Sequence, residues 1–321
     1  MWHCVPCFAD EAGEEWTMSA SVDEQVEWAR ASALVVMAPE RCVLEVTGAD
    51  RLSWLNGLLT CQLASRTVGE AVHGLAVAQK GKIVTDVVVV IAKDRALVVV
   101  QRATVEALVA SFEHHLMMED AEMKPVPLDV CFAHGPRAAE VLVGAVEGGA
   151  VGGPFDATGL GGAVILTAAG DDSALAVQRA AERAGGGVGD DAGWDAVRVA
   201  AGVAKFGVDF DDATYPQEAA LETKAVSFDK GCYLGQEVVC MLEMRGHVKR
   251  KLVSLALDGA PGAPMPAAHT GVDDGKGTAI GEVTSVVRLR DGETRALAML
   301  KYAFIGKGTE VRVGDRTARV L

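Results

Sequence analysis

The last quarter of the chain changes character after His247, and this change constrains the fold more than any other feature. Short apolar runs follow one another there, separated by turn residues such as Asp291-Gly292 and Gly314-Asp315. Runs of this length between turn signals are typical of small all-β domains, so we predict a β-barrel over residues 248–321. The predicted strands are Lys251–Leu257, Ala279–Val287, Arg295–Leu300, Glu310–Val313 and Thr317–Leu321.

Before the barrel, apolar runs alternate with segments of helical periodicity, which predicts an α+β arrangement. The expected strands lie at 43–46, 74–78, 83–91, 96–100, 126–132 and 163–167. The expected helices lie at 51–59, with Asp50 as its cap, and at 104–117, 137–143, 173–184, 194–201 and 219–225. Residues 144–162 are rich in glycine and alanine and are predicted to form a loop with at most short structure.

Composition excludes several classes of protein. Half of the 321 residues are hydrophobic and the formal net charge is −14. This acidity argues against non-specific binding to nucleic acid or to an anionic membrane. Neither a transmembrane stretch nor a secretory signal is evident, and seven scattered cysteines suit a reducing cytoplasm, so a cytoplasmic location is expected.

The first residues carry a separate signal. Cys4 and Cys7, with His3 beside them, have the spacing of a metal or redox pair, but no second pair follows. Terminal segments are usually loose. Residues 1–20 are therefore expected to form a disordered extension, and no metal site is predicted.

The stretch FDKGCYLGQEVV, Phe228 to Val239, is the strongest candidate for chemistry. Gly231 and Gly235 are expected to turn the chain sharply around Cys232, and a helix is expected from Gly235 to Gly246. A thiol just outside a helix N-terminus is favoured as the thiolate, and Lys230 adds positive charge nearby. The residues alone leave two interpretations open, a reactive thiol or a small residue in a tight turn.

A basic cluster follows this stretch in an otherwise acidic chain. Its members are Arg245, His247, Lys249, Arg250 and Lys251. The cluster is either a solvated strand start or a site for carboxylates or phosphates. Upstream, Glu218 either caps a helix or pairs with the N–H edge of a heterocycle such as a pterin.

The string KGCYLGQE closely resembles the K-G-C-[FY]-x-G-Q-E signature of the YgfZ family, a folate-binding branch related to the glycine cleavage T-protein, an aminomethyltransferase. Other segments also fit the family: TGADRLSWLNGLLT, QKGKIVTD, HGPRAAEVL, WDAVRVAAGVAKFGVD and YPQEAAL. The resemblance covers roughly residues 40–321.

The resemblance implies a three-domain α+β cloverleaf around a central channel, with a C-terminal β-barrel. The first folate-binding domain would comprise 21–120 and 200–247, the second 121–199, and the barrel 248–321. Tetrahydrofolate, or a substituted reduced folate, would bind in the channel. The family's role in maintaining iron–sulfur proteins implies iron–sulfur client or assembly proteins as partners, with no nucleic acid and no membrane.

The resemblance also assigns residues to the site. Cys232, Lys230 and Asp86 are the expected reactive groups. The expected folate contacts are Trp194, Glu218, Tyr233, Gln236, Glu237, Arg245, Lys249 and Arg250. Trp194 alternatively packs in the core as a helix residue.

The chain departs from its relatives at three informative positions. The T-protein G-x-I-x-D-D segment keeps only one carboxylate here, Asp86. Gln101-Arg102 replaces the Asn-Ala of T-proteins, and Arg41 stands where YgfZ proteins have a folate-site tryptophan. The first two changes, with the cysteine motif, weaken the case for aminomethyl transfer, and the third weakens the case for one folate contact. Three functions are therefore compared: a folate-dependent accessory protein for iron–sulfur clusters, an aminomethyltransferase, and a folate-binding scaffold without chemistry.

Overall fold

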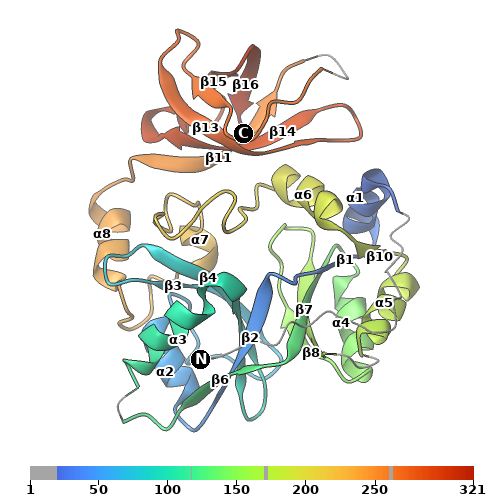
Figure 1. The fold of residues 1–321 in the computed structure, drawn as a ribbon, viewed down its shortest axis with the longest axis vertical. Coiled ribbons are helices and arrows are strands. Elements are labelled where there is room, and N and C mark those ends of the chain that lie inside the picture. The colour runs from blue at the N-terminus through green and yellow to red at the C-terminus, as the bar shows by residue number, and fades with distance from the viewer. Residues whose placement is uncertain (1–19, 117, 170–172, 260–262) are drawn as a thin grey trace. The chain divides into compact units, whose positions relative to one another are not determined.

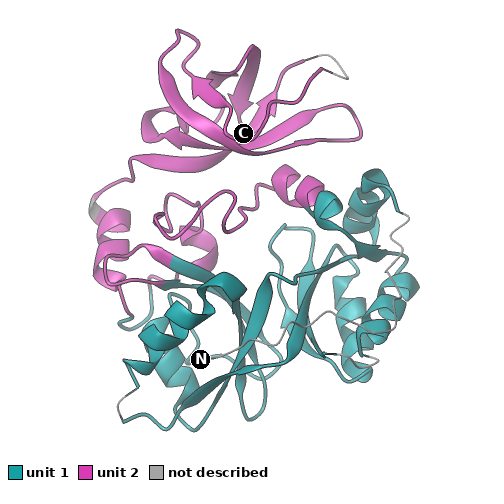
Figure 2. Ribbon diagram, in the orientation of Figure 1, with its two compact units in different colours: residues 1–76, 84–194, 229–233 teal, residues 77–83, 195–228, 234–321 magenta. Residues whose placement is uncertain are grey.

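The computed structural model describes residues 20–116, 118–169, 173–259 and 263–321. Figure 1 shows the order of the elements, and Figure 2 colours two compact units. Unit 1 comprises residues 1–76, 84–194 and 229–233, and unit 2 comprises 77–83, 195–228 and 234–321. The Cys4–Cys7 pair and all but the last residue of the predicted extension lie outside the described residues.

Unit 1 is built on two five-stranded sheets, and nearly all of their residues belong to this unit. The first has the order β3-β4-β5-β2-β6 and consists of β2 (Arg41–Thr47), β3 (Ala71–Val77), β4 (Ile83–Ile91), β5 (Ala96–Gln101) and β6 (Glu122–Val126). The second has the order β10-β1-β7-β9-β8 and consists of β1 (Leu34–Met37), β7 (Leu128–His134), β8 (Val151–Pro154), β9 (Gly162–Ala168) and β10 (Gly187–Gly189).

The two sheets pack face to face. One apolar cluster joins Val43, Val88 and Val99 of the first sheet to Val130 and Val164 of the second. Along β4, neighbouring valines alternate between this cluster and another that packs against helices. Successive strand residues point to opposite faces, so a strand covered on both sides must be apolar throughout, which explains the unbroken run of valines.

Helices cover the outer faces of the sheets. The helices are α1 (Val22–Ala31), α2 (Arg51–Leu58), α3 (Val105–Glu113), α4 (Ala138–Glu147) and α5 (Ser173–Arg183), with a short helix η1 (Arg102–Thr104) before α3. The helix α6 (Asp191–Ala200) is divided between the units, with residues 191–194 in unit 1 and 195–200 in unit 2. Leu55 and Leu58 of α2 and Leu108 and Phe112 of α3 pack on the first sheet. Val141 of α4 and residues of α5 pack on the second.

Unit 2 contains a closed antiparallel barrel of the order β11-β14-β13-β12-β15-β16. Its strands are β11 (Arg250–Leu257), β12 (Gly271–Asp273), β13 (Ala279–Arg288), β14 (Thr294–Lys301), β15 (Glu310–Val313) and β16 (Arg316–Val320). The unit also holds α7 (Glu222–Ala225), α8 (Gln236–Arg245) and η2 (Tyr302–Phe304). The predicted α+β class with a C-terminal barrel is therefore confirmed.

Several local predictions need correction. The strand β6 was not predicted, because Pro125 interrupts its pattern; the strand pairs only with β2, and a sheet edge tolerates proline. Asp50 precedes α2 but does not cap it, since its carboxylate accepts the Asp120 N–H at 2.9 Å instead. The helix expected at 219–225 is shorter, because Ala220 takes a left-handed φ of 56°.

The expected loop at 144–162 contains short structure, as the prediction allowed, and begins later than predicted. The helix α4 continues to Glu147, and β8 adds an edge strand to the second sheet. The strand β1, which the predicted division places with the first domain, pairs with β7 and β10 of the second sheet. The predicted domain boundaries themselves remain a prediction.

Candidate functional site

Cys232 is exposed and lies four positions before the first residue of α8. Gly235 is the residue before the helix and has a left-handed φ of 76°. A Cβ atom there would lie 2.3 Å from the Ala78 carbonyl oxygen, so this position requires glycine. Gly231 differs from the prediction: its φ is not left-handed, and a Cβ atom there would meet open space.

Exposure separates Cys232 from the other described cysteines. Cys42, Cys61 and Cys131 are buried, and Cys240 is partly buried. Burial raises the pKa of Cys61 to about 11, and the positive charge of Lys230 only partly opposes this effect. Burial likewise raises the pKa of Cys131 to about 12. These buried thiols stay protonated and unreactive at neutral pH.

Lys230 occupies a different place from the one predicted. Its side chain is buried, and its ammonium donates to the carbonyl oxygens of Asn56 at 2.6 Å, Leu59 at 2.7 Å and Cys61 at 2.6 Å. Burial lowers the pKa of Lys230 to about 8. An ammonium has three N–H donors, and here all three bind backbone carbonyls. None is left to bind the Cys232 thiol.

Asp86 lies on β4 as the centre of a small buried polar cluster. Its carboxylate accepts from Arg41 Nη2 at 2.7 Å and from Gln101 Nε2 at 3.2 Å. Burial would raise the pKa of Asp86, but the charge and hydrogen bond of Arg41, with His73 and Gln101, hold it below the usual value. Two of the positions at which the sequence departs from T-proteins or YgfZ proteins therefore meet on one carboxylate.

Glu218 is buried in unit 2. Its Oε2 accepts the Tyr215 N–H at 3.1 Å, and its Oε1 lies 3.5 Å from Arg250 Nε. The second distance is longer than a direct hydrogen bond, which leaves Oε1 able to accept from another donor. Glu218 thus closes a local turn through Oε2, and the pairing of its carboxylate with a heterocycle stays a prediction.

The predicted basic cluster is partly neutralised. Arg250 faces Glu218, and Lys251 binds the carboxylate of Glu222. The His247 ring stacks on Tyr302 with centroids 4.5 Å apart, and Lys249 is exposed. Two of the five predicted anion-binding residues therefore already face carboxylates of unit 2.

Trp194, in the first half of α6, stacks on His134 with ring centroids 4.1 Å apart and planes within 10°. His134 is buried, and burial lowers its pKa to about 4, so the imidazole is neutral at pH 7. Its Nδ1 atom is buried without a hydrogen-bond partner among the described residues. Trp194 itself remains half-buried.

The remaining predicted residues lie on the segment from Tyr233 to α8. The Tyr233 ring is buried, with Lys230 Nζ 5.2 Å from its centroid. Gln236 is half-buried and Glu237 exposed in the first turn of α8. Arg245 ends the helix, and its side chain is not among those described.

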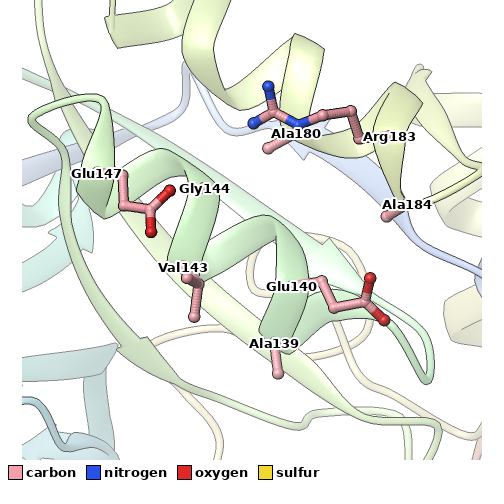
Figure 3. Close-up of a pocket in the computed structure, with 8 residues that line it drawn as sticks. All are labelled: Ala139, Glu140, Val143, Gly144, Glu147, Ala180, Arg183 and Ala184. Carbon is pink, nitrogen blue, oxygen red and sulfur yellow. The ribbon is translucent and has the colours of Figure 1, made fainter.

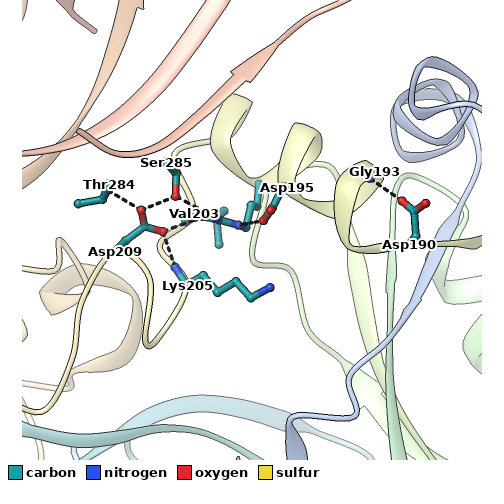
Figure 4. Close-up of polar contacts among 9 residues, drawn as sticks. Asp190, Gly193, Asp195, Val203, Lys205, Asp209, Thr284 and Ser285 are labelled. Carbon is teal, nitrogen blue, oxygen red and sulfur yellow. Dashed lines mark hydrogen bonds and ion pairs between the residues drawn. The ribbon is translucent and has the colours of Figure 1, made fainter. Parts of the chain in front are cut away.

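The sequence did not predict a buried ionic network in unit 2. Asp209 accepts from the Arg198 guanidinium, the Lys205 backbone N–H and the hydroxyls of Thr284 and Ser285. Figure 4 shows Asp209 with Lys205, Thr284 and Ser285 around it. The Arg198–Asp209 distance is 2.7 Å, and Arg198 also contacts Asp195, the Val203 carbonyl and Ser285. The network ties the chain after α6 to β13. A single arginine in a helix, such as Arg198, does not indicate from the sequence that it will form a buried ionic network.

A shallow hollow of about 500 Å³ lies between α4 and α5. Figure 3 shows the carboxylates of Glu140 and Glu147 and the Arg183 guanidinium along it. None of its lining residues was predicted to be functional. Within the described part of the chain, no three His, Cys, Asp or Glu side chains gather to hold a metal ion. No described helix has both the length and the apolar character of a membrane span.

Comparisons with known proteins identify a domain family, a relative and a solved structure to which this chain is similar. Residues 1–151 match the model of the GCVT N-terminal domain. The tRNA-modifying protein YgfZ from Vibrio vulnificus is 24% identical over 230 residues, which span 69% of each chain. The crystal structure of the glycine cleavage aminomethyltransferase T from Bartonella henselae superposes with a TM-score of 0.78 at 21% identity, covering 94% of this chain and 88% of that one.

The chain resembles YgfZ and shares the T-protein fold. The resemblance inferred from the sequence is thereby confirmed. At 21% identity the aminomethyltransferase structure supports the fold alone. The YgfZ-like chain nevertheless differs chemically from T-proteins at Asp86, where Arg41 and Gln101 bind the surviving carboxylate.

Proposed function

We propose that this chain is a tetrahydrofolate-binding, YgfZ-like protein that supports the assembly or repair of iron–sulfur clusters through Cys232. The observation that carries the proposal is the exposure of Cys232 directly before α8, in contrast with the buried thiols of Cys42, Cys61 and Cys131. Cysteine ligates iron as the thiolate, and the thiolate needs access to solvent and to its partner.

The acidic net charge bears on the kind of partner. The curated relative is named a tRNA-modifying protein, but a chain with a net charge of −14 is poorly suited to bind tRNA directly. We infer that it acts on a protein partner, a client or an assembly protein for clusters. An effect on tRNA modification would then arise through such a partner.

The residues present are chemically suited to a reduced folate. Glu218 Oε1 is available to accept hydrogen bonds from the N–H edge of the pteridine. Separately, the half-buried Trp194 offers an aromatic surface beside the neutral His134 ring. Lys249 is exposed and suits the carboxylates of the folate glutamate tail. Tetrahydrofolate, when bound, supplies nitrogen atoms that can carry one-carbon units.

A folate titration followed by tryptophan fluorescence tests the cofactor assignment. We expect a saturable change with tetrahydrofolate in the wild type and a smaller change in Trp194→Phe, with Trp54→Phe as the control because Trp54 is packed in the core against Phe112. Glu218→Gln is expected to weaken binding by about tenfold, the effect of losing one charge-assisted hydrogen bond. Absence of any saturable response to reduced folates would remove the folate from the proposal.

Aminomethyl transfer is the rival function, and the contacts of Asp86 disfavour it. A general base must be free to take a proton, and its pKa should lie near the working pH. Asp86 is instead paired with Arg41 and has a lowered pKa. Assaying the purified protein with an aminomethyl-loaded carrier protein and tetrahydrofolate tests this directly, and steady turnover would favour the rival.

A folate-binding scaffold without chemistry is the third function. It shares the folate prediction with the proposal but gives Cys232 no role. Alkylation of Cys232 as a function of pH separates the two, because an activated thiol reacts at a lower pH than an ordinary one. An ordinary thiol profile would favour the scaffold.

A further inference from the structure

We propose that Lys230 positions Cys232 by fastening the segment 229–233 to the chain between α2 and β3. The inference rests on the proposed function for the importance of Cys232. The fastening itself is a property of unit 1, which contains every group involved. Lys230 is thereby given a structural task in the motif, in place of the charge effect on the thiol that the sequence predicted.

The acceptors of Lys230 lie at the end of a helix. Carbonyls in the last turn of a helix have no partner within the helix, and the helix dipole favours a cation there. The helix α2 ends at Leu58, and the ammonium binds the carbonyls of Asn56, Leu59 and Cys61. The cation comes from a residue 169 to 174 positions away in the sequence. A long-range contact therefore completes the helix end.

The segment 56–61, whose carbonyls bind Lys230, makes further hydrogen bonds of its own. Asn56 Oδ1 accepts the Leu63 N–H at 2.8 Å, which closes the turn after α2. Thr60 binds Leu75 of β3 in both directions, through its N–H at 3.0 Å and its hydroxyl at 2.8 Å. Lys230 thus attaches the motif to a connection that is itself hydrogen-bonded to β3 of the first sheet.

Cys232 lies in the sequence between two residues with buried side chains, Lys230 and Tyr233. The side chains of Lys230 and Tyr233 are buried, whereas Gly231 and Cys232 are exposed. Fixing both neighbours while leaving the thiol outside presents a reactive group in one orientation without burying it. Since all three Lys230 donors are used on carbonyls, its effect on Cys232 is one of position.

Lys230→Met tests the inference, because methionine keeps an unbranched stem but lacks the donors. We expect amide hydrogen exchange at residues 231–233 to rise at least about tenfold, while exchange in β4 and β5 is unchanged. The control is Lys80→Met, which removes an exposed lysine from a turn. Unchanged exchange at 231–233 in Lys230→Met would overturn the inference.

A second variant covers the case in which Lys230→Met does not fold. Lys230→Arg keeps the charge but cannot direct three N–H groups to the same carbonyls from one atom. It is expected to show the same rise in exchange, with an unchanged pH midpoint for Cys232 alkylation. Unchanged exchange at 231–233 in Lys230→Arg would instead mean that a positive charge at this position suffices, and would overturn the inference.

The two proposals fail separately. If Cys232→Ser still supports iron–sulfur enzymes in cells, the proposed function fails while the exchange result stands. If Lys230→Met leaves exchange unchanged while Cys232→Ser abolishes support, the positioning role fails and the function stands.

Discussion

Two arginine–aspartate pairs, Arg198–Asp209 in unit 2 and Arg41–Asp86 in unit 1, use the same residue types but differ in how completely they are satisfied. Asp209 accepts from four donors in three segments, and each nitrogen of Arg198 has an acceptor. Asp86 accepts from Arg41 and Gln101 side chains, whereas Arg41 Nε is buried without a partner among the described residues.

The Arg198–Asp209 network is completely hydrogen-bonded, whereas the Arg41–Asp86 pair is not. A fully satisfied buried network fixes one arrangement of the chain, here the connection after α6 on β13. The Arg41–Asp86 pair leaves the Arg41 Nε donor without an acceptor among the described residues, and a buried donor without a partner lowers stability. We therefore expect the Arg41–Asp86 pair to contribute less to stability than the Arg198–Asp209 network.

The largest expected effect is on the satisfied network. Asp209→Ala leaves the Arg198 charge buried without its main partner, and breaking such a pair typically costs 3–5 kcal/mol, so we expect a loss of about 4 kcal/mol in unfolding free energy. Urea denaturation measures it. Asp212→Ala, at an exposed position, is the control and should change stability by less than about 0.5 kcal/mol. Equal stabilities of the two variants would contradict the description of this network.

Arg41→Met is expected to cost somewhat less, about 3 kcal/mol at pH 7, because Asp86 is left buried as an unpaired charge. In the wild type the lowered pKa of Asp86 contributes stability above about pH 4, which is lost as the pH falls. In the variant burial is opposed only by His73 and Gln101, so the pKa of Asp86 is expected to rise and acidification relieves the penalty.

The measurement is the difference in unfolding free energy between wild type and Arg41→Met at several pH values. It should shrink as the pH falls from 7 toward 4. A difference that stays constant over this range would mean that Asp86 does not titrate as described. Arg51→Met, whose guanidinium binds backbone carbonyls, is a suitable control.

The smallest expected effect comes from Gln101→Leu. This change removes the hydrogen bond from Gln101 Nε2 to Asp86 Oδ1 but keeps the Arg41 pair. One such bond contributes about 1 kcal/mol. Thermal unfolding of the variant should show this loss, and a loss as large as that of Arg41→Met would mean that the amide, not the guanidinium, holds the carboxylate.

The sequence predicted well those elements whose signals are local. The hairpin of β4 and β5 and five barrel strands follow from apolar runs separated by turn residues. The strands β1, β6, β8, β10 and β12 were missed because they are short, with three to five residues each, and Pro125 interrupts β6. Ala220 stopped a predicted helix through a left-handed conformation that alanine rarely adopts.

The site was less predictable because its contacts are long-range. Arg41 and Gln101 were each identified as unusual, but only the pairing of β2 with β5 places them opposite one another and beside Asp86. Lys230 was assigned to Cys232 from its neighbouring position, whereas its side chain reaches the end of α2. Proximity in the sequence therefore did not predict the contacts of Lys230, and the functional roles of these residues stay predictions.

The proposal that Cys232 is the working group is tested most directly in cells that lack their own YgfZ-like protein. The activity of an iron–sulfur enzyme is measured after expression of the wild type, Cys232→Ser or Cys240→Ser. We expect full recovery with the wild type and with Cys240→Ser, and no recovery with Cys232→Ser at equal protein levels. Recovery with Cys232→Ser equal to that of the wild type would contradict the account.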